Sequence, residues 1–335
     1  MIYIHVPFCR SFCTYCDFYS EIACRGKDGK ALGEYVQDLL GEIDRRRPEI
    51  LETLGVDTLY IGGGTPSVLP PDCLRAIVSA LPGAPWAEFT MEVNPEDIVQ
   101  KGREYIHALL DLGVNRVSMG VQSLDDGMLR WMNRRHDAEG ARRAFRMLRE
   151  AGMGSISVDL ITGVPGMTMR MLQDSVSEVL DWRPEHISAY QLSVEEGSAL
   201  ASMIQEGRCS EAPEEECRAQ YEFLCDALKE AGYVHYEISN WALPGFEAKH
   251  NSAYWTRAPY VGLGPGAHSL SGNGLVRSWN SQELSGWTRD SETLGPEEVR
   301  EEEIMLGLRT SGGWNGKVIP EKDWFIADEI ISLYL

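Results

Sequence analysis

The sequence lacks the features of a membrane-spanning or exported protein. No run approaches the roughly 18 apolar residues that a transmembrane helix needs. The N-terminal segment MIYIHVPFCR has neither the basic region nor the small-residue cleavage site of a signal peptide. We therefore expect a cytoplasmic protein with no transmembrane segment, and the sequence leaves peripheral membrane contact open.

Basic residues are scarce in this chain of 335 residues. Lys and Arg together number 31 against 51 Asp and Glu, which gives a formal net charge of −20. Nucleic acids bind basic surfaces, so this balance argues against a nucleic-acid partner. The hydrophobic share of 43% is that of an ordinary globular protein with a sizeable core, which excludes disorder as the main state.

Cysteines are too few for a disulfide scaffold, since the chain has only eight. Half of them crowd into the N-terminal segment as Cys9, Cys13, Cys16 and Cys24, and the rest are scattered as Cys73, Cys209, Cys217 and Cys225. Clustered thiols in a reducing compartment indicate metal or redox chemistry. We interpret Cys24 and the four scattered cysteines as packing residues.

Short β-rich segments alternate with amphipathic segments through the first two-thirds of the chain. The expected strands are Ile2–Val6, Asp57–Gly62, Glu88–Val93, Asn115–Val121, Ile156–Ile161 and His186–Leu192. The expected helices are Glu34–Arg46, Asp72–Leu81, Glu104–Leu112, Ala138–Ala151 and Met169–Trp182. This alternation predicts an α/β fold of parallel βαβ units. Six units favour a partial, three-quarter (β/α) barrel, and a doubly wound open sheet is the alternative.

Several of these strands alternate between apolar and polar residues. Glu92, Gln122 and Asp159 fall opposite the apolar face of their strands and near the strand ends. One face of each strand can therefore pack under helices, while the other lines a wet or ligand-filled lumen. Barrel active sites form at the carboxyl ends of the strands, where these three residues lie.

The alternation of strand-like and helix-like segments ends after about Gly197. A long helical pattern ends at Gly232, and the chain then becomes rich in Gly, Trp and Tyr. We therefore predict a core barrel over residues 1–232 and a smaller α+β extension over residues 233–335.

The strongest motif is C-x3-C-x2-C, formed by Cys9, Cys13 and Cys16 directly after the first strand. Three thiolates can hold three irons of an iron–sulfur cube and leave the fourth iron open to a ligand. A zinc site completed by His5 is the alternative. The cluster is favoured because His5 belongs to the strand rather than the loop, and because flanking aromatic residues suit a shielded cluster.

The motif resembles that of the radical S-adenosylmethionine (SAM) superfamily. A second matching feature is the GGGTP segment Gly62–Pro66, which follows the second strand and corresponds to the superfamily segment that contacts the methionine amino group of SAM. The resemblance implies a [4Fe–4S] cluster and SAM as cofactors. It also implies reductive cleavage of SAM to methionine and a 5′-deoxyadenosyl radical, with an electron donor as partner.

A finer resemblance is to the oxygen-independent coproporphyrinogen III oxidase family, which includes the HemW-type haem chaperones. The matching segments are Tyr3–Cys9, Gly62–Pro66, Glu92–Pro95, Ser118–Ser123, Asp159–Pro165, His250–Trp255 and Gly262–Ser269. The resemblance implies cluster ligation by Cys9, Cys13 and Cys16. It implies SAM contacts from Tyr3, Gly63, Gly64, Thr65, Glu92, Gln122, Arg134, Asp159 and Ala189, and it assigns no separate catalytic residue.

Two functions within this family compete, an oxidase in porphyrin biosynthesis and a carrier that delivers haem to a recipient haemoprotein. Phe18 stands where the oxidase branch has a fourth cysteine, and only eight residues precede Cys9. The segment His250–Trp255 resembles the HNxxYW haem-binding motif of the chaperones, which implies haem contacts from His250, Tyr254 and Trp255. We therefore favour the carrier.

Two matters stay open at this level. The family pattern fades after Thr310, and the chain is shorter than the family's usual length. The sequence also does not distinguish a catalytic use of SAM cleavage from a role in gating haem transfer.

Overall fold

The computed structural model describes residues 1–22 and 29–335. Cys24, interpreted above as a packing thiol, lies outside the described residues. The other seven cysteines are free thiols. Within the described part of the chain, no helix combines the length and the apolar character needed to cross a bilayer.

All six expected strands form, and they lie side by side in one parallel sheet. They are β1 (Ile2–Val6), β4 (Thr58–Gly63), β5 (Glu88–Val93), β6 (Arg116–Gln122), β7 (Ile156–Thr162) and β8 (His186–Gln191). Their order in the sheet follows their order in the chain. A doubly wound sheet would reverse its strand order partway, so the consecutive order confirms the partial barrel and excludes the alternative.

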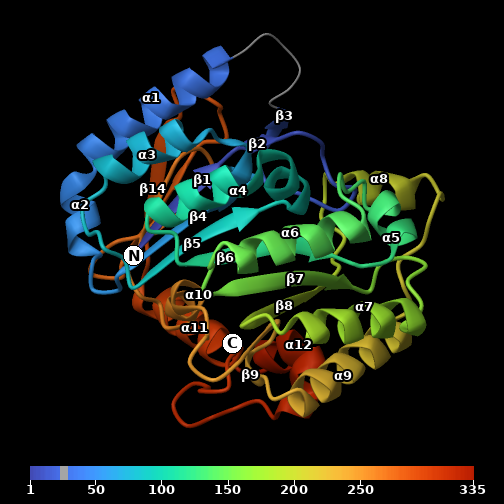
Figure 1. Cartoon of the computed structure of the whole chain (residues 1–335). Coiled ribbons are helices and arrows are strands. Elements are labelled where there is room, and N and C mark those ends of the chain that lie inside the picture. Colours follow the sequence, from blue (N-terminus) through green and yellow to red (C-terminus); the bar gives the residue numbers. More distant parts are fainter. Residues whose placement is uncertain (23–28) are drawn as a thin grey trace.

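The helices after these strands cover the outer face of the sheet (Figure 1). They are α1 (Gly29–Arg45), α2 (Arg47–Glu52), α3 (Pro71–Ala80), α4 (Pro95–Asp111), α5 (Asp126–Trp131), α6 (Ala138–Glu150) and α7 (Met169–Trp182). Side-chain oxygens of Asn94, Asp137 and Thr168 accept backbone hydrogen bonds at the starts of α4, α6 and α7. The apolar strand face and the helices form the core, which leaves the other strand face toward the lumen.

The later part of the chain is built from shorter elements. They are α8 (Ala199–Gln205), α9 (Glu214–Glu230), β9 (Val234–Glu237), β10 (Asn240–Ala242), α10 (Lys249–Trp255), β11 (Val261–Leu263), β12 (His268–Leu270), β13 (Val276–Asn280), β14 (Arg289–Thr293), α11 (Pro296–Gly307) and α12 (Ala327–Ser332). Two short helices of the 3-10 type, η1 (Pro66–Val68) and η2 (Glu321–Ile326), and the small strands β2 (Phe8–Cys9) and β3 (Glu21–Ile22) complete the set.

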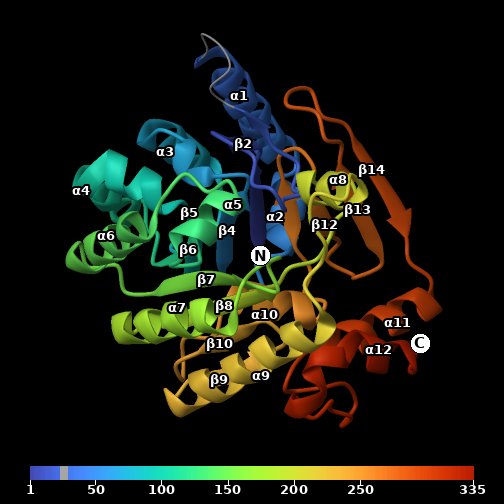
Figure 2. The ribbon, with the colours of Figure 1, turned by 90° about the vertical axis from the view of Figure 1, so that its right-hand side faces the viewer.

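This later part extends both edges of the sheet (Figure 2). Strand β10 pairs antiparallel with β8, and β9 pairs with β10. Strand β11 pairs in parallel with β1, at the opposite edge. The outer strands of the sheet are therefore β11 and β9, both from residues 233–335, and the division of the chain after residue 232 stays a prediction.

A buried ion pair explains why β11 reaches the first strand. Glu42, in the last turn of α1, and Arg46, which directly follows α1, form an ion pair at 2.9 Å, and both side chains are almost fully buried. The Arg46 guanidinium also donates to the Gly262 carbonyl of β11 at 2.6 Å and to the Ser269 hydroxyl at 3.0 Å. One charged cluster thus holds together segments more than 200 residues apart in the chain.

Candidate cofactor site at the carboxyl ends of the strands

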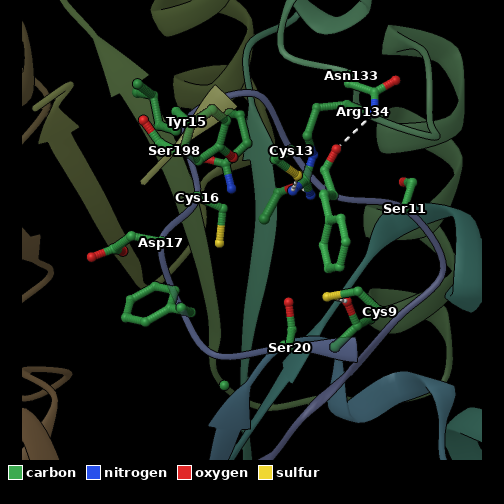
Figure 3. Close-up of a pocket in the computed structure, with 18 of the residues that line it drawn as sticks. Cys9, Ser11, Cys13, Tyr15, Cys16, Asp17, Ser20, Asn133, Arg134 and Ser198 are labelled. Carbon is green, nitrogen blue, oxygen red and sulfur yellow. Dashed lines mark hydrogen bonds between the residues drawn. The ribbon is translucent and has the colours of Figure 1, made fainter. Parts of the chain in front are cut away.

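A cavity of about 1060 Å3 opens at the carboxyl ends of the parallel strands. The cysteine loop after β1 forms one side of it, and the strand ends of β4, β5, β6 and β7 form its base. Figure 3 shows Cys9, Cys13 and Cys16 around a common space, with Arg134 beside them. The motif thus lies where the polar strand faces end.

The three cysteines occupy the cavity wall in different settings. The Cys9 Sγ lies 3.5 Å from the Thr65 hydroxyl, and the Cys13 Sγ lies 3.3 Å from the Arg134 guanidinium. Burial raises the pKa of Cys9, and it raises the pKa of Cys16 to about 11. Both thiols must therefore lose a proton before they can bind a metal, which couples metal loading to proton release. The guanidinium of Arg134 places a positive charge beside the Cys13 sulfur.

The spacing of the three sulfurs bears on the choice between a cluster and a single zinc ion. A tetrahedral zinc ion with bonds of about 2.3 Å holds its sulfur ligands roughly 3.8 Å apart. The sulfurs of Cys9, Cys13 and Cys16 do not all lie within 4.8 Å of one another. The proposed fourth zinc ligand, His5, has its ring nitrogens on Tyr3 at 3.1 Å and on the Tyr19 carbonyl at 2.9 Å. The wider spacing fits a cluster, whose irons separate the thiolates.

The glycine segment after β4 packs directly against the cysteine loop. The Gly64 amide donates to the Val6 carbonyl at 2.8 Å. A Cβ atom on Gly64 would lie 2.8 Å from the Phe8 carbonyl oxygen and 3.1 Å from the Cys9 Sγ. Only glycine permits this close approach, which places Gly63 and Gly64 in the cavity wall.

Glu92 is the acidic group nearest the glycine segment. Its carboxylate accepts hydrogen bonds from the Tyr60 hydroxyl at 2.7 Å and the Gly63 amide at 3.1 Å. Burial raises the pKa of Glu92 to about 7, and the negative charge of Asp159 adds to this effect. A cationic ligand would favour the ionised form, so the carboxylate is suited to bind an ammonium group.

Asp159 lies on β7 and is held by hydroxyl groups. Ser118 donates to both of its oxygens, at 3.0 and 2.9 Å, and Ser157 donates at 3.2 Å. Burial raises the pKa of Asp159 although these hydrogen bonds oppose the shift. The pair Glu92 and Asp159 makes this side of the cavity acidic.

Two polar groups in the cavity wall lack partners among the described residues. They are the Oε1 atom of Gln122 and the Nε atom of Arg134, both buried. Gln122 has a left-handed backbone, with φ of 67°, at an irregularity in the pairing of β6 with β7. Buried polar atoms are normally hydrogen-bonded, so these groups indicate a polar ligand in the cavity.

The structure brings most of the expected SAM residues together. Gly63, Gly64, Thr65, Glu92, Gln122, Arg134 and Asp159 all line the cavity. Two others do not line it. Tyr3 lies on β1, its hydroxyl bonded to His5, and Ala189 is buried in β8 opposite Leu160.

Two cavity residues escaped the sequence analysis. Tyr60 and Tyr190 line the cavity, and the Tyr60 hydroxyl donates a hydrogen bond to Glu92. Period-two alternation would have found Tyr60. Leu59 is buried in the core, so the next residue, Tyr60, points to the opposite, lumen face of β4. No sequence signal singled out Tyr190 as a lining residue of the cavity.

The expected haem residues lie away from this cavity. His250, on α10, bonds through Nδ1 to the Thr58 hydroxyl at 2.9 Å and through Nε2 to the Tyr254 hydroxyl at 3.1 Å. Its amide donates to Glu88 at 3.0 Å. Thr58 and Glu88 begin β4 and β5, so His250 lies at the opposite end of these strands from the cysteine loop.

The environment of His250 is that of a packed imidazole. It is buried, and burial lowers its pKa to about 3. Haem iron could bind it only after one of its two ring hydrogen bonds breaks. The neighbouring Trp255 has a buried Nε1 with no partner among the described residues. His268, at the start of β12, is exposed beside Trp279.

Comparison with known proteins gives a consistent result. A family model described as the radical SAM superfamily matches residues 3–179. The chain is 33% identical to "Heme chaperone HemW" of Bacillus subtilis, covering 96% of this chain and 86% of that protein. It is 35% identical to the protein of the same name from Lactococcus lactis, covering 93% and 82%.

A solved structure shows the same fold. It is the coproporphyrinogen III oxidase HemN from Escherichia coli, described as a radical SAM enzyme. It superposes with a TM-score of 0.76 and covers 92% of this chain and 75% of that chain. At 22% sequence identity, this likeness supports the fold and carries no functional assignment.

Proposed function

The chain belongs to the radical SAM superfamily and, within it, to the family of HemW haem chaperones, and from this premise we propose that it binds haem and delivers it to a recipient haemoprotein. The observation that carries the proposal is the identity of 33–35% to proteins named haem chaperones over more than nine-tenths of the chain. The recipient and the electron donor belong to the proposal.

The cavity fits the cofactors of the superfamily. Cys9, Cys13 and Cys16 would hold a [4Fe–4S] cluster, with Arg134 as a fixed cation beside Cys13. That cluster supplies one electron for the reductive cleavage of SAM. Glu92 and the glycine segment would bind the ammonium group of its methionine part, since Glu92 and Gly63 meet at the cavity wall.

The mouth of the cavity suits a large flat ligand. Phe12 is 47% exposed and Phe18 is 66% exposed, and both line the cavity. Exposed aromatic rings can pack against the face of a porphyrin. Phe18 also occupies the position at which the oxidase branch has its fourth cysteine. This difference supports the carrier over the oxidase.

Two imidazoles are candidates for the haem ligand, His250 and His268. We expect the purified, cluster-loaded protein to bind haem with a defined Soret band under anaerobic conditions. Loss of the axial imidazole changes the ligand field of the iron, so substitution of the ligand should shift this band. Haem titration of the wild type, His250→Ala and His268→Ala identifies which ring is used, and cluster absorbance reports that each variant is folded.

A turnover assay separates the carrier from the oxidase. The same preparation is supplied with SAM, a strong reductant and coproporphyrinogen III. The carrier is expected to bind haem and to leave coproporphyrinogen undecarboxylated. Robust decarboxylation, or the absence of haem binding in a protein that retains its cluster, contradicts the proposed function.

A further inference from the structure

Three potential metal ligands meet at the far edge of the sheet, outside the cofactor cavity. Cys225 lies on α9, His235 on β9 and Glu321 at the start of η2. The Nδ1 atom of His235 is 3.9 Å from the Cys225 Sγ and 3.1 Å from a Glu321 carboxylate oxygen. In the described residues, this is the one group of three such atoms that all lie within 4.8 Å of one another.

The imidazole of His235 is held in one orientation. It stacks on Trp241 with ring centres 4.0 Å apart and planes at 14°, and the edge of Trp324 meets it at 4.3 Å. Its Nε2 atom lies 3.2 Å from the Ile238 carbonyl oxygen. A metal-binding histidine commonly donates its second ring N–H to a backbone carbonyl, which fixes the ring and directs the other nitrogen to the metal.

In either neutral tautomer, one ring nitrogen of His235 presents its lone pair to an oxygen acceptor. With the proton on Nε2, the Ile238 carbonyl is satisfied, and the lone pair of Nδ1 faces the carboxylate of Glu321 at 3.1 Å. With the proton on Nδ1, the lone pair of Nε2 faces the carbonyl instead. In each tautomer the unprotonated ring nitrogen and the oxygen that it faces repel each other, because both are hydrogen-bond acceptors. A cation bound between Nδ1 and Glu321, with the proton on Nε2, removes that repulsion.

The position of the thiol favours a metal over other uses of these groups. In a cysteine–histidine–acid catalytic triad, the thiol and the acid contact different ring nitrogens. Here Cys225 and Glu321 both approach Nδ1, while Nε2 is taken by the backbone. A simple ion pair between His235 and Glu321 would need no thiol at all.

We propose that Cys225, His235 and Glu321 bind a divalent transition-metal ion of the zinc class. Zinc bonds of about 2.0–2.3 Å hold ligand atoms roughly 3.3–3.8 Å apart, and the distances of 3.1 and 3.9 Å lie close to this range. Cys225 binds as the thiolate, and its proton leaves to solvent. Glu321 is 41% exposed, so water completes the fourth position.

The ion joins three elements of the later part of the chain. Glu321 begins η2, which leads into α12, whereas Cys225 and His235 belong to α9 and the edge strand β9. Metal binding therefore fastens residues 321–332 to the edge of the barrel. This role assigns a purpose to Cys225 that differs from the packing role expected from the sequence, and it does not depend on haem or SAM.

The test uses the cluster-loaded protein, so that Cys9, Cys13 and Cys16 are occupied. Zinc is titrated anaerobically by calorimetry, and the bound zinc is characterised by X-ray absorption at the zinc edge, where iron does not interfere. We expect about one zinc per chain with a single sulfur ligand. Cys225→Ser should remove the sulfur ligand, and Glu321→Gln should weaken zinc binding at least about tenfold.

Cys209→Ser is the matched control, since Cys209 is a half-buried thiol outside the group of three ligands. It should leave stoichiometry and affinity unchanged. Because Glu321 is partly exposed, Glu321→Gln should keep the fold. This variant therefore still tests the site if Cys225→Ser fails to fold. Failure of the wild type to bind zinc, zinc bound through several sulfurs, or unchanged affinity in both variants overturns the proposal.

Discussion

At the scale of single residues, the charge on Glu92 should control SAM binding. Burial raises its pKa to about 7, so the carboxyl group is largely protonated at pH 6 and ionised at pH 8. An ionised partner stabilises the ammonium group of a ligand more than a neutral one, by about 1.5–3 kcal/mol. We therefore expect SAM to bind more tightly at pH 8 than at pH 6, by up to about tenfold.

The substitution Glu92→Gln tests this at constant shape. The variant should bind SAM about ten- to a hundredfold more weakly at pH 8 and should lose most of the pH dependence. Its iron and sulfide content should equal that of the wild type, whereas Cys13→Ala should lose the cluster. Calorimetry at both pH values makes the measurement, and an unchanged SAM affinity in Glu92→Gln would refute the role given to Glu92.

At the scale of elements, the fit between the glycine segment and the cysteine loop should be sensitive to a single methyl group. In Gly64→Ala, the added Cβ would lie 2.8 Å from the backbone oxygen of Phe8. Backbone must then move, at a cost of about 1–3 kcal/mol, and Cys9 moves with it. We expect reduced iron and sulfide content after reconstitution, measured by chemical analysis.

Gly55→Ala is the control for this prediction. Nothing lies within 4 Å of a Cβ built on Gly55, which belongs to the turn before β4. This variant should assemble the cluster as the wild type does. Equal cluster content in Gly64→Ala and Gly55→Ala would show that the close approach of the two loops is not needed.

At the scale of the whole molecule, the buried pair of Arg46 and Glu42 should hold the later part of the chain to the barrel. In Arg46→Met, the carboxylate of Glu42 keeps only neutral donors, among them the Gly264 amide at 2.9 Å and the Trp287 indole at 3.0 Å. Breaking a buried pair on one side costs about 3–5 kcal/mol. We expect a loss of this size in the free energy of unfolding, measured by urea titration.

The neighbouring Arg47→Met provides the comparison. Arg47 is exposed and donates to the Ala80 carbonyl at 3.0 Å. Its replacement should change the free energy of unfolding by less than about 0.5 kcal/mol. A loss below about 1 kcal/mol for Arg46→Met would mean that the ion pair does not fasten the two parts of the molecule.

The sequence alone determined the elements and the chemistry that depend on local pattern. Strand boundaries such as those of β1 and β5 match the sequence expectation because alternation and turn residues are local signals. The same period of two predicted that Glu92 and Asp159 face the lumen, and both line the cavity. The cysteine motif was visible because its three thiols belong to a single loop.

Tertiary structure decided everything that depends on residues distant in the chain. It set the two ring contacts of His250, one with Thr58, which lies 192 residues away, and one with Tyr254. The role of His250 as a haem ligand stays a prediction. It also brought Cys225, His235 and Glu321 together from three elements. Short strands and single side chains carry too little local pattern to reveal their partners, because those partners are selected by packing and burial across the whole fold.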